Sequence, residues 1–366
     1  MKRNHLLLSA IAILFSIQGF SQTKDSTASF KISGYVDAYY AHYTDSVGTN
    51  NYQKFPDISP KSNVFGLNVA QITGQYSSQK LRAVVTLHYG DIPASAWSTD
   101  FNMIQEANAG IRISKNIWLD AGFFKTHIGT EALLPKDNIA SSLSIITFYE
   151  PWWQAGVKLS FTPNDKLSVT LHVLNGYNTF IDNNKKKSVG LGFNYYFGDK
   201  GNIGYYNLLG DESPDGTGRS HLRFLNNIVF TYRLTPKLKT VIGADYITQQ
   251  HSAISDSNKT ASVYSGIITL RYQLKPIWAV YARGETFSDK DGFLTGIIID
   301  SQNKSTGYKL SGATVGVEYK PYENSFIRLE ARDLIMNKDQ QIFHKENSAT
   351  NNNNRFEVMI NIGVWF

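Results

Sequence analysis

The chain contains no cysteine and, outside its first twenty positions, no long apolar run. The absence of cysteine excludes a disulfide scaffold, a zinc ribbon and a thiol enzyme. A polytopic helical membrane protein is excluded as well, because each of its helices needs about 20 consecutive apolar residues. A strong charge of one sign is also missing, since the formal net charge of +6 comes from scattered lysines and arginines. Nucleic-acid-binding proteins carry clustered basic patches, so we expect no nucleic-acid partner.

The amino-terminal stretch has the organisation of a secretory signal. Lys2 and Arg3 precede an apolar core from Leu6 to Ile17, and small residues follow in the tripeptide Gly19-Phe20-Ser21. A basic start, a short apolar core and small residues at the cleavage site are typical of signal peptides. We therefore predict a cleaved signal peptide over residues 1–21, a short polar segment over residues 22–28 and one mature domain over residues 29–366.

From residue 29 onward the chain is rich in aromatic residues and alternates apolar with polar positions. Its 21 Tyr, 21 Phe and 6 Trp residues are too many for a disordered protein. Alternation at a period of two is typical of a β-strand whose two faces meet different environments. In the last segment, for example, Val358, Ile360 and Ile362 share one face, and Glu357 and Asn361 lie on the other. The pattern predicts about sixteen strands, over residues 29–43, 64–77, 80–91, 104–114, 116–128, 153–162, 166–178, 187–198, 202–211, 221–234, 238–252, 260–274, 277–289, 309–320, 325–336 and 355–366.

Such two-faced strands fit either a soluble sandwich or propeller with the apolar face inward, or a membrane barrel with the apolar face outward. The predicted strands are longer than the usual five or six residues of soluble sheets and suit a tilted membrane crossing. Short turns alternate with long, polar loops, as expected when turns face the periplasm and loops face the exterior. Aromatic residues such as Tyr89, Trp118 and Trp278 lie near strand ends, where membrane barrels carry aromatic girdles. We therefore predict an all-β fold, a transmembrane antiparallel up-and-down barrel.

Three parts of the sequence resemble a known family. The opening strand reads SGYVDAYY over residues 33–40, the stretch GTEALLPKDN over residues 129–138 leads to YEPWWQAG over residues 149–156, and the last strand ends in Phe366. With these segments the mature chain is similar to the OmpL-like β-barrel porin family of Gram-negative outer membranes. The resemblance implies a location in the outer membrane, contact with its lipid and a channel-like role without a defined solute. The last strand resembles the signal that the barrel-assembly machinery reads, which implies that machinery as a partner through Phe366.

The polar face of the predicted strands would line a lumen. By alternation, the predicted pore-lining residues are Arg82, Arg112, Lys158, Arg223, Arg233, Arg271, Arg283, Arg328, Arg332, Asp37, Glu106, Asp120, Asp245, Glu285, Glu318 and Glu330. The mixture of signs favours a water-filled, weakly selective pore over a strongly anion-selective tunnel. The alternative is that these charges pair across strands, as Arg328 could with Glu318, and only keep the wall hydrated.

The connection over residues 129–152 is the longest and is unusually apolar, yet it carries Glu131, Asp137 and Glu150. A loop that is surrounded by water has little reason to be apolar. We therefore predict that it folds into the lumen as a constriction, with Glu131 and Asp137 facing basic wall residues such as Arg82 and Arg112. A lid at the rim and a contact between subunits are the two alternatives.

Catalytic and metal sites have no support in the sequence. The histidines of the mature chain are dispersed and form no spaced motif with carboxylates. We expect no enzyme activity, no metal and no cofactor, and we predict a porin for passive diffusion of small hydrophilic solutes or ions. A plugged structural or adhesive barrel with partner-binding loops is the alternative, an outer-membrane hydrolase is a more distant one, and assembly into a homo-oligomer is left open.

Overall fold

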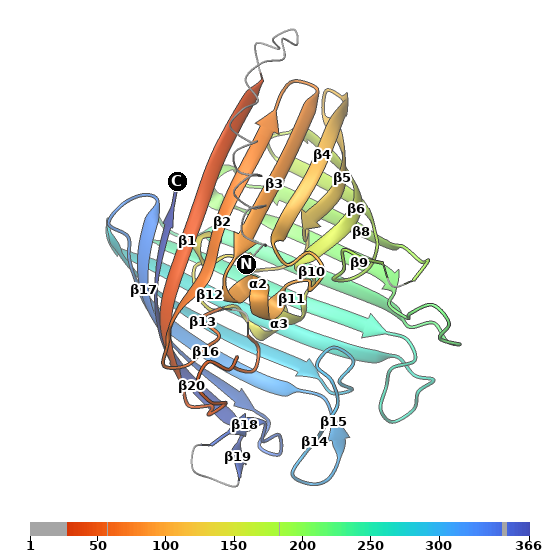
Figure 1. The fold of residues 1–366 in the computed structure, drawn as a ribbon, viewed down its shortest axis with the longest axis vertical. Helices are drawn as coiled ribbons and strands as arrows, with labels where there is room; N and C mark the ends of the chain where they lie inside the picture. The colour runs from red at the N-terminus through yellow and green to blue at the C-terminus, as the bar shows by residue number, and fades with distance from the viewer. Residues whose placement is uncertain (1–27, 57, 183, 346–349) are drawn as a thin grey trace, which may run out of the picture.

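The protein, seen here in a computed structural model that describes residues 28–56, 58–182, 184–345 and 350–366, is a closed β-barrel (Figure 1). Each barrel strand pairs with its neighbours in the chain, and the last strand pairs with the first to close the sheet. The sixteen barrel strands are β1 (Ser29–Tyr43), β2 (Phe65–Ser77), β3 (Leu81–Tyr89), β4 (Ile104–Ser114), β5 (Ile117–Lys125), β6 (Trp153–Asn164), β7 (Leu167–Leu174), β8 (Ser188–Tyr196), β9 (Gly201–Asp211), β10 (Leu222–Arg233), β11 (Leu238–Gln249), β12 (Ala261–Lys275), β13 (Trp278–Asp289), β16 (Lys309–Tyr319), β17 (Ser325–Met336) and β20 (Asn354–Trp365). The predicted fold class is confirmed, whereas the predicted signal peptide lies outside the described residues.

The connections between strands contain small elements that the sequence pattern did not predict. Two short helices, α2 (Asp91–Ala96) and α3 (Ile145–Tyr149), and two 3₁₀ turns, η1 (Pro135–Asp137) and η2 (Gly198–Lys200), interrupt the strands. Helices of five or six residues are too short to display a helical period of apolar residues, so alternation could not find them. No helix of the described residues has the length and apolar character to cross a membrane.

Two small hairpins extend the barrel at its long-loop end. One pairs β14 (Ile298–Ile299) with β15 (Ser305–Thr306), and the other pairs β18 (Phe343–His344) with β19 (Asn351–Asn352). Figure 1 shows both hairpins at the bottom of the view, beyond the ends of the barrel strands. The opposite end carries short turns such as residues 234–237, and we call it the short-turn end.

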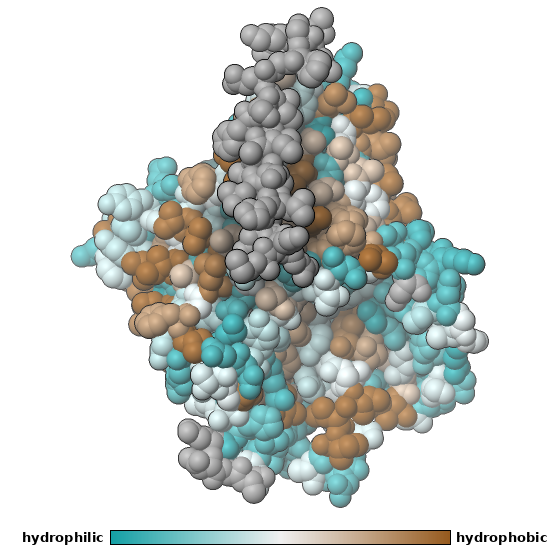
Figure 2. Space-filling model, in the orientation of Figure 1, coloured by the Kyte–Doolittle hydropathy of each residue, from teal (hydrophilic) through white to brown (hydrophobic). Residues whose placement is uncertain are grey.

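The two faces of the barrel wall have opposite chemistry. On β20, Ile360, Ile362 and Val364 are exposed on the outside, whereas Glu357 and Asn361 are buried on the inside. Figure 2 shows hydrophobic side chains gathered over the strands at the left and upper right of the view. An apolar outside and a polar inside are the reverse of a soluble sandwich and suit a barrel in lipid.

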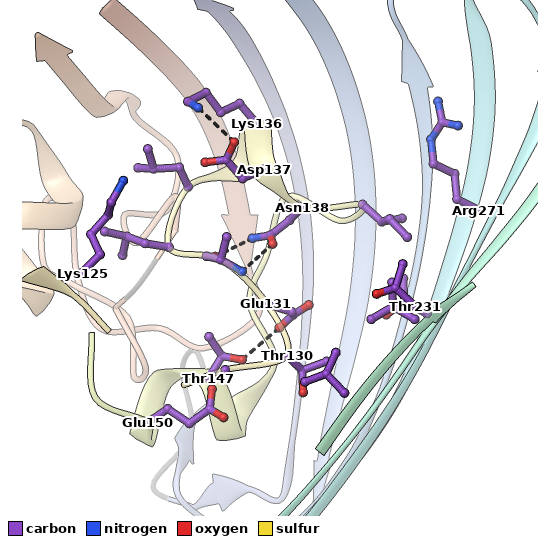
Figure 3. A pocket seen from close by; sticks show the side chains of 18 of the residues that line it. Lys125, Thr130, Glu131, Lys136, Asp137, Asn138, Thr147, Glu150, Thr231 and Arg271 are labelled. Atoms are coloured by element: carbon purple, nitrogen blue, oxygen red, sulfur yellow. Dashed lines mark hydrogen bonds and ion pairs between the residues drawn. The ribbon is translucent and has the colours of Figure 1, made fainter. Parts of the chain in front are cut away.

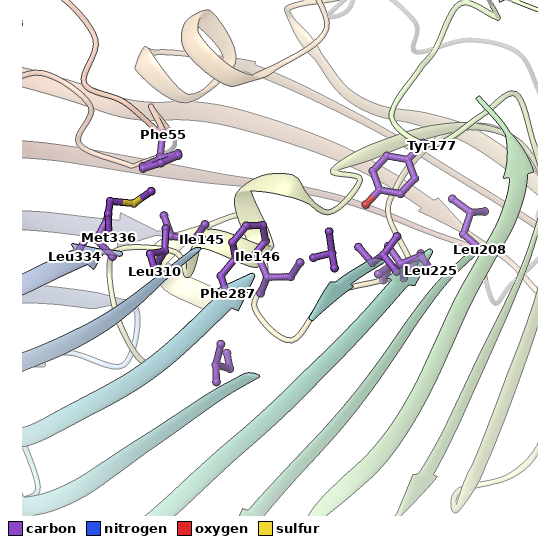
Figure 4. Close-up of a cluster of buried hydrophobic side chains, with 14 of the residues drawn as sticks. Phe55, Ile145, Ile146, Tyr177, Leu208, Leu225, Phe287, Leu310, Leu334 and Met336 are labelled. Atoms are coloured by element: carbon purple, nitrogen blue, oxygen red, sulfur yellow. The ribbon is translucent and has the colours of Figure 1, made fainter. Parts of the chain in front are cut away.

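The interior of the barrel is partly filled by residues 126–152, which we call the inward segment. In Figure 1, helix α3 of this segment lies in the middle of the view, surrounded by strands. Its Ile145 and Ile146 are buried among inward-facing wall residues such as Leu225 and Phe287 (Figure 4). A second apolar cluster joins Leu134, Leu143 and Trp152 of the segment to Trp97 and Phe326. The apolar composition of the segment is therefore explained by its burial inside the barrel.

Candidate functional site: the lumen wall and the inward segment

The strand register places all sixteen predicted pore-lining residues on the inner face of the barrel. Residues that pair directly across antiparallel strands share a face. One inner row, for example, runs from Arg332 on β17 to Thr314 on β16 and Arg283 on β13. Rows of the same kind contain the other residues of the predicted set. The wall residues differ, however, in what they contact.

Arg283 holds the inward segment against β13. Its guanidinium donates to Glu131 Oε1 at 2.7 Å, to the carbonyl oxygen of Ser142 at 2.6 Å and to Ser142 Oγ at 2.8 Å. The side chain is fully buried and also lies 3.7 Å from Glu285. Burial strengthens these charged contacts and makes the loss of any partner costly. Arg283 is therefore an anchor of the segment.

Two wall carboxylates bind backbone N–H groups of the segment. Glu330 accepts from the N–H groups of Ser141 and Ser142 at 2.8 and 3.1 Å, and from Tyr281 Oη at 2.8 Å. Glu285 accepts from the N–H of Ile145, the first residue of α3, at 2.8 Å. Backbone groups in a buried segment need such partners. These contacts explain how an irregular piece of chain can lie inside the barrel.

Arg328 anchors the other end of the segment, near η1. It donates to the carbonyl oxygens of Pro135 and Asn138 at 2.8 and 2.9 Å. The same guanidinium pairs with Glu318 at 2.7 Å, and Glu318 also pairs with Arg271 at 2.6 Å. The cross-strand pairing that the sequence left as an alternative is thus present here, together with contacts to the segment.

A separate group of charges covers the wall of β3 to β6. Arg82 makes a bidentate pair with Asp120, at 2.6 and 2.5 Å, and Lys158 lies 4.0 Å from the same carboxylate. The Arg82 and Arg112 guanidinium groups both stack on Trp118, with centroid distances of 4.4 and 4.9 Å. Arg82 is therefore paired with an acid of the wall itself and does not contact the acids of the inward segment.

Glu131 faces a basic wall residue as predicted, but neither acid contacts Arg82 or Arg112, the two arginines named as examples, and Asp137 pairs within the segment. Glu131 pairs with Arg283, and Asp137 pairs with its neighbour Lys136 at 2.9 Å. The sequence could not reveal this, because the choice of partner depends on which side of the barrel the segment packs against. Its apolar side chains fix that side by packing against the inner faces of β9 to β17.

Glu150, the third acidic residue of the segment, has no cationic partner among the described residues. It is buried, and neither of its carboxylate oxygens accepts a hydrogen bond from them. Burial, and after it the negative charge of Asp245, raises the pKa of Glu150 well above its usual value. Asp245 is held by Asn227, whose Nδ2 donates to it at 2.8 Å. Glu150 of the segment and Asp245 of strand β11 thus form an acidic pair where the segment packs against the wall.

The structure also unites two histidines that are distant in the sequence. The rings of His127 and His172 stack with centroids 3.9 Å apart, and His127 contacts Gln154 Oε1 and the carbonyl oxygen of Asn207. Burial lowers the pKa of His127. Within the described part of the chain, no group of three or more His, Cys, Asp or Glu side chains is arranged to hold a metal ion.

A cavity of about 960 Å³ lies between the inward segment and the wall of β9 to β12 and β16. Figure 3 shows Lys136, Asp137 and Asn138 of the segment on one side and Thr231 and Arg271 of the wall on the other. The lining reaches residues of two short turns, so the cavity lies toward the short-turn end. Of the predicted pore-lining set, it contains Arg271, Glu318 and Arg328.

Lys239 also lines this cavity, and it was absent from the predicted set. A second recess of about 230 Å³ adjoins the cavity through Thr231 and Lys239 and is lined by Arg233 as well. Strand parity could have identified Lys239, because it lies six residues before Asp245 on the same strand and therefore on the same face.

Solved structures with similar folds include a porin and an outer membrane channel. The anion-selective porin from Comamonas acidovorans has 10% identity and a TM-score of 0.61, with 93% of this chain and 100% of that chain covered. The outer membrane channel DcaP of Acinetobacter baumannii has 12% identity and a TM-score of 0.61, with 95% and 99% covered. OmpF of Salmonella typhi, in a complex with daunomycin, has 13% identity and a TM-score of 0.57, with 95% and 100% covered. At these identities the likeness concerns the fold alone.

At the sequence level, no curated protein matches the chain. A family model does match it, under the description "Putative beta-barrel porin-2, OmpL-like", over residues 29–366. The match spans every barrel strand, from β1 to β20. The chain therefore belongs to this OmpL-like family of β-barrel porins, as its sequence pattern and its closed barrel both indicated.

Proposed function

We propose that the protein is an outer-membrane porin through which small hydrophilic solutes or ions diffuse passively, with the inward segment narrowing the lumen. The cavity of about 960 Å³ between this segment and the charged wall carries the proposal. Polar and charged side chains line it from both sides, and such linings let hydrated solutes pass. In this role the protein is a channel without enzymatic activity, and it needs no cofactor.

A porin of the outer membrane must be exported and inserted, and the two ends of the chain would serve these steps. Residues 1–21 act as a signal peptide that is removed after export. The strand that ends in Phe366 is then recognised by the barrel-assembly machinery, and the finished barrel contacts outer-membrane lipid through its apolar outer face.

The plugged barrel remains a second candidate function, because one observation favours it. The inward segment, Phe55 of the β1–β2 connection and wall residues such as Leu225 form a continuous buried apolar cluster across the interior. Apolar constrictions can close a pore by excluding water. A barrel of this kind would act through its outer loops.

Planar-bilayer recordings of the purified full-length chain distinguish the two functions. Stable single-channel steps that scale with salt concentration are expected for the porin. Bilayers that contain folded protein and remain silent would contradict it and favour the plugged barrel. The protein recovered from the chamber should run as the folded species in a gel without heating, so that silence is not confused with unfolding.

A further inference from the structure

Three basic residues lie side by side on the inner wall near the short-turn end. Arg233 on β10 pairs directly with Lys239 on β11, and Lys239 pairs directly with Arg271 on β12. We call these residues the basic row. Residues that face each other in this way lie about 5 Å apart, and like charges in such positions destabilise a sheet. The fold therefore carries a row of repelling charges on three successive strands.

The basic row is only partly neutralised. Among the described residues, Arg233 and Lys239 have no ion pair or hydrogen bond of their side chains, and both are exposed inside the barrel mouth. Arg271 pairs with Glu318, but that carboxylate is shared with Arg328. A row that served only to stabilise the wall would be expected to alternate in sign.

The other charges around the cavity do not neutralise the positive charge of the basic row. On the facing inward segment, Glu131 is bound to Arg283 and Asp137 to Lys136. Beside the row, Asp199 lines the small recess together with Lys200. Glu150 and Asp199 line the cavity and the recess without an ion pair among the described residues. With every acid counted, the combined lining still holds eight basic and five acidic side chains, so positive charge remains in excess.

Neutral hydrogen-bond donors continue the same face. Thr231 lies two residues from Arg233, and Thr269 lies two residues from Arg271, so both hydroxyl groups point to the same side as the row. Both line the cavity. An anion that leaves water at the row would thus find two cations and nearby hydroxyl donors, which are the groups that carboxylates and phosphates accept hydrogen bonds from.

We propose that the basic row makes the pore selective for small anions that carry carboxylate or phosphate groups. This inference rests on the proposed porin function and specifies the charge of its solute. Because the Cβ atoms of neighbouring residues in the row are about 5 Å apart, two of these long cationic side chains can reach the same anion when it carries two or more charges. The mixed signs seen in the sequence predicted weak selectivity, whereas the pairing in the structure leaves an excess of positive charge.

The test measures reversal potentials of single channels under a gradient of KCl near 0.1 M, where charges are screened over only about 10 Å. We expect chloride to be more permeant than potassium, and we expect the permeability ratio to fall by about threefold or more in the double variant Arg233→Gln/Lys239→Gln. The matched control is Lys185→Gln/Lys304→Gln, which removes two exposed lysines from long loops at the opposite end and should leave the ratio unchanged.

A second measurement uses inorganic phosphate and succinate as probes. Each should reduce the chloride current of the wild type in a concentration-dependent manner, and the double variant should need several-fold more of either probe. The variant removes repulsion between neighbours, so it should fold at least as well as the wild type.

The outcomes separate the two proposals. Channels that prefer potassium, or whose ratio is the same in wild type and double variant, would overturn the anion selectivity and leave the porin standing. The absence of channels from folded protein would overturn the porin itself, and with it the role of the row.

Discussion

Arg283 shows how much one buried side chain can stabilise the inward segment. Replacing it with methionine keeps the bulk but leaves Glu131 buried without its cation, whereas Glu285 keeps Arg332 as a partner. Breaking a buried pair in this way costs about 3–5 kcal/mol, so we expect Arg283→Met to lower the free energy of unfolding by about that amount. Urea unfolding of the barrel in lipid vesicles measures it. Arg112→Met is the control, because Arg112 is exposed and only stacks on Trp118; an equal loss in both variants would contradict the anchoring role.

Glu150 links the packing of the segment to pH. Burial and the charge of Asp245 raise its pKa in the folded protein. A carboxyl group with a raised folded-state pKa stabilises the folded state at low pH, and this contribution is lost as the pH rises through that pKa. We therefore expect the melting temperature to fall between about pH 5 and about pH 8, and Glu150→Gln to flatten that fall.

Thermal melts of the barrel in detergent at both pH values measure this effect. Asp137→Asn is the matched control, because Asp137 lies on the same segment but is half exposed and paired with Lys136. A pH dependence that is the same in Glu150→Gln and the wild type would assign the effect to another group.

At the scale of elements, the inward segment is the part that decides how much of the lumen is open. It fills the space between two apolar clusters and faces the cavity of about 960 Å³. Deleting residues 133–146 removes η1 and the start of α3 and should increase single-channel conductance, because a wider lumen holds more mobile ions. Removal of residues 299–304 from the β14–β15 hairpin, which projects beyond the barrel, is the control. A conductance unchanged by the first deletion would contradict the constriction.

The barrel strands were the most predictable elements, and the short helices were the least. The predicted ranges 29–43, 104–114 and 325–336 coincide with β1, β4 and β17. A strand in a barrel contacts lipid on one face and the interior on the other. Its apolar and polar residues therefore alternate at a period of two, which can be read from the strand's own sequence. Helix α3 has only five residues, four of them hydrophobic, and is buried inside the barrel, so it is too short to show a periodic signature.

At the scale of the whole molecule, closure of the barrel depends on close packing where β20 meets both β17 and β1. A side chain on Gly363 would meet the ring of Phe326 at 2.5 Å and that of Tyr35 at 3.1 Å, and both rings are buried. Overpacking of this kind costs about 1–3 kcal/mol, so Gly363→Val should reduce the fraction of closed barrel. The shift between unheated and heated samples in gel electrophoresis measures that fraction.

Gly284→Val is the control for this prediction. A side chain there would meet only Ile268, at 3.8 Å, which is ordinary contact. Both variants place a strand-favouring residue on a barrel strand. Equal losses in the two variants would show that the seam between β17, β20 and β1 is not specially sensitive.

Strand positions, their two faces and the membrane setting are determined by the amino-acid sequence itself, because alternation depends only on near neighbours along the chain. The partners of the charges are not. Glu131 meets Arg283 from 152 residues away, and Arg233, Lys239 and Arg271 become one row only through the register of three strands. Long-range packing thus decided which charges pair between the wall and the inward segment, and which cations of the wall are left facing the lumen.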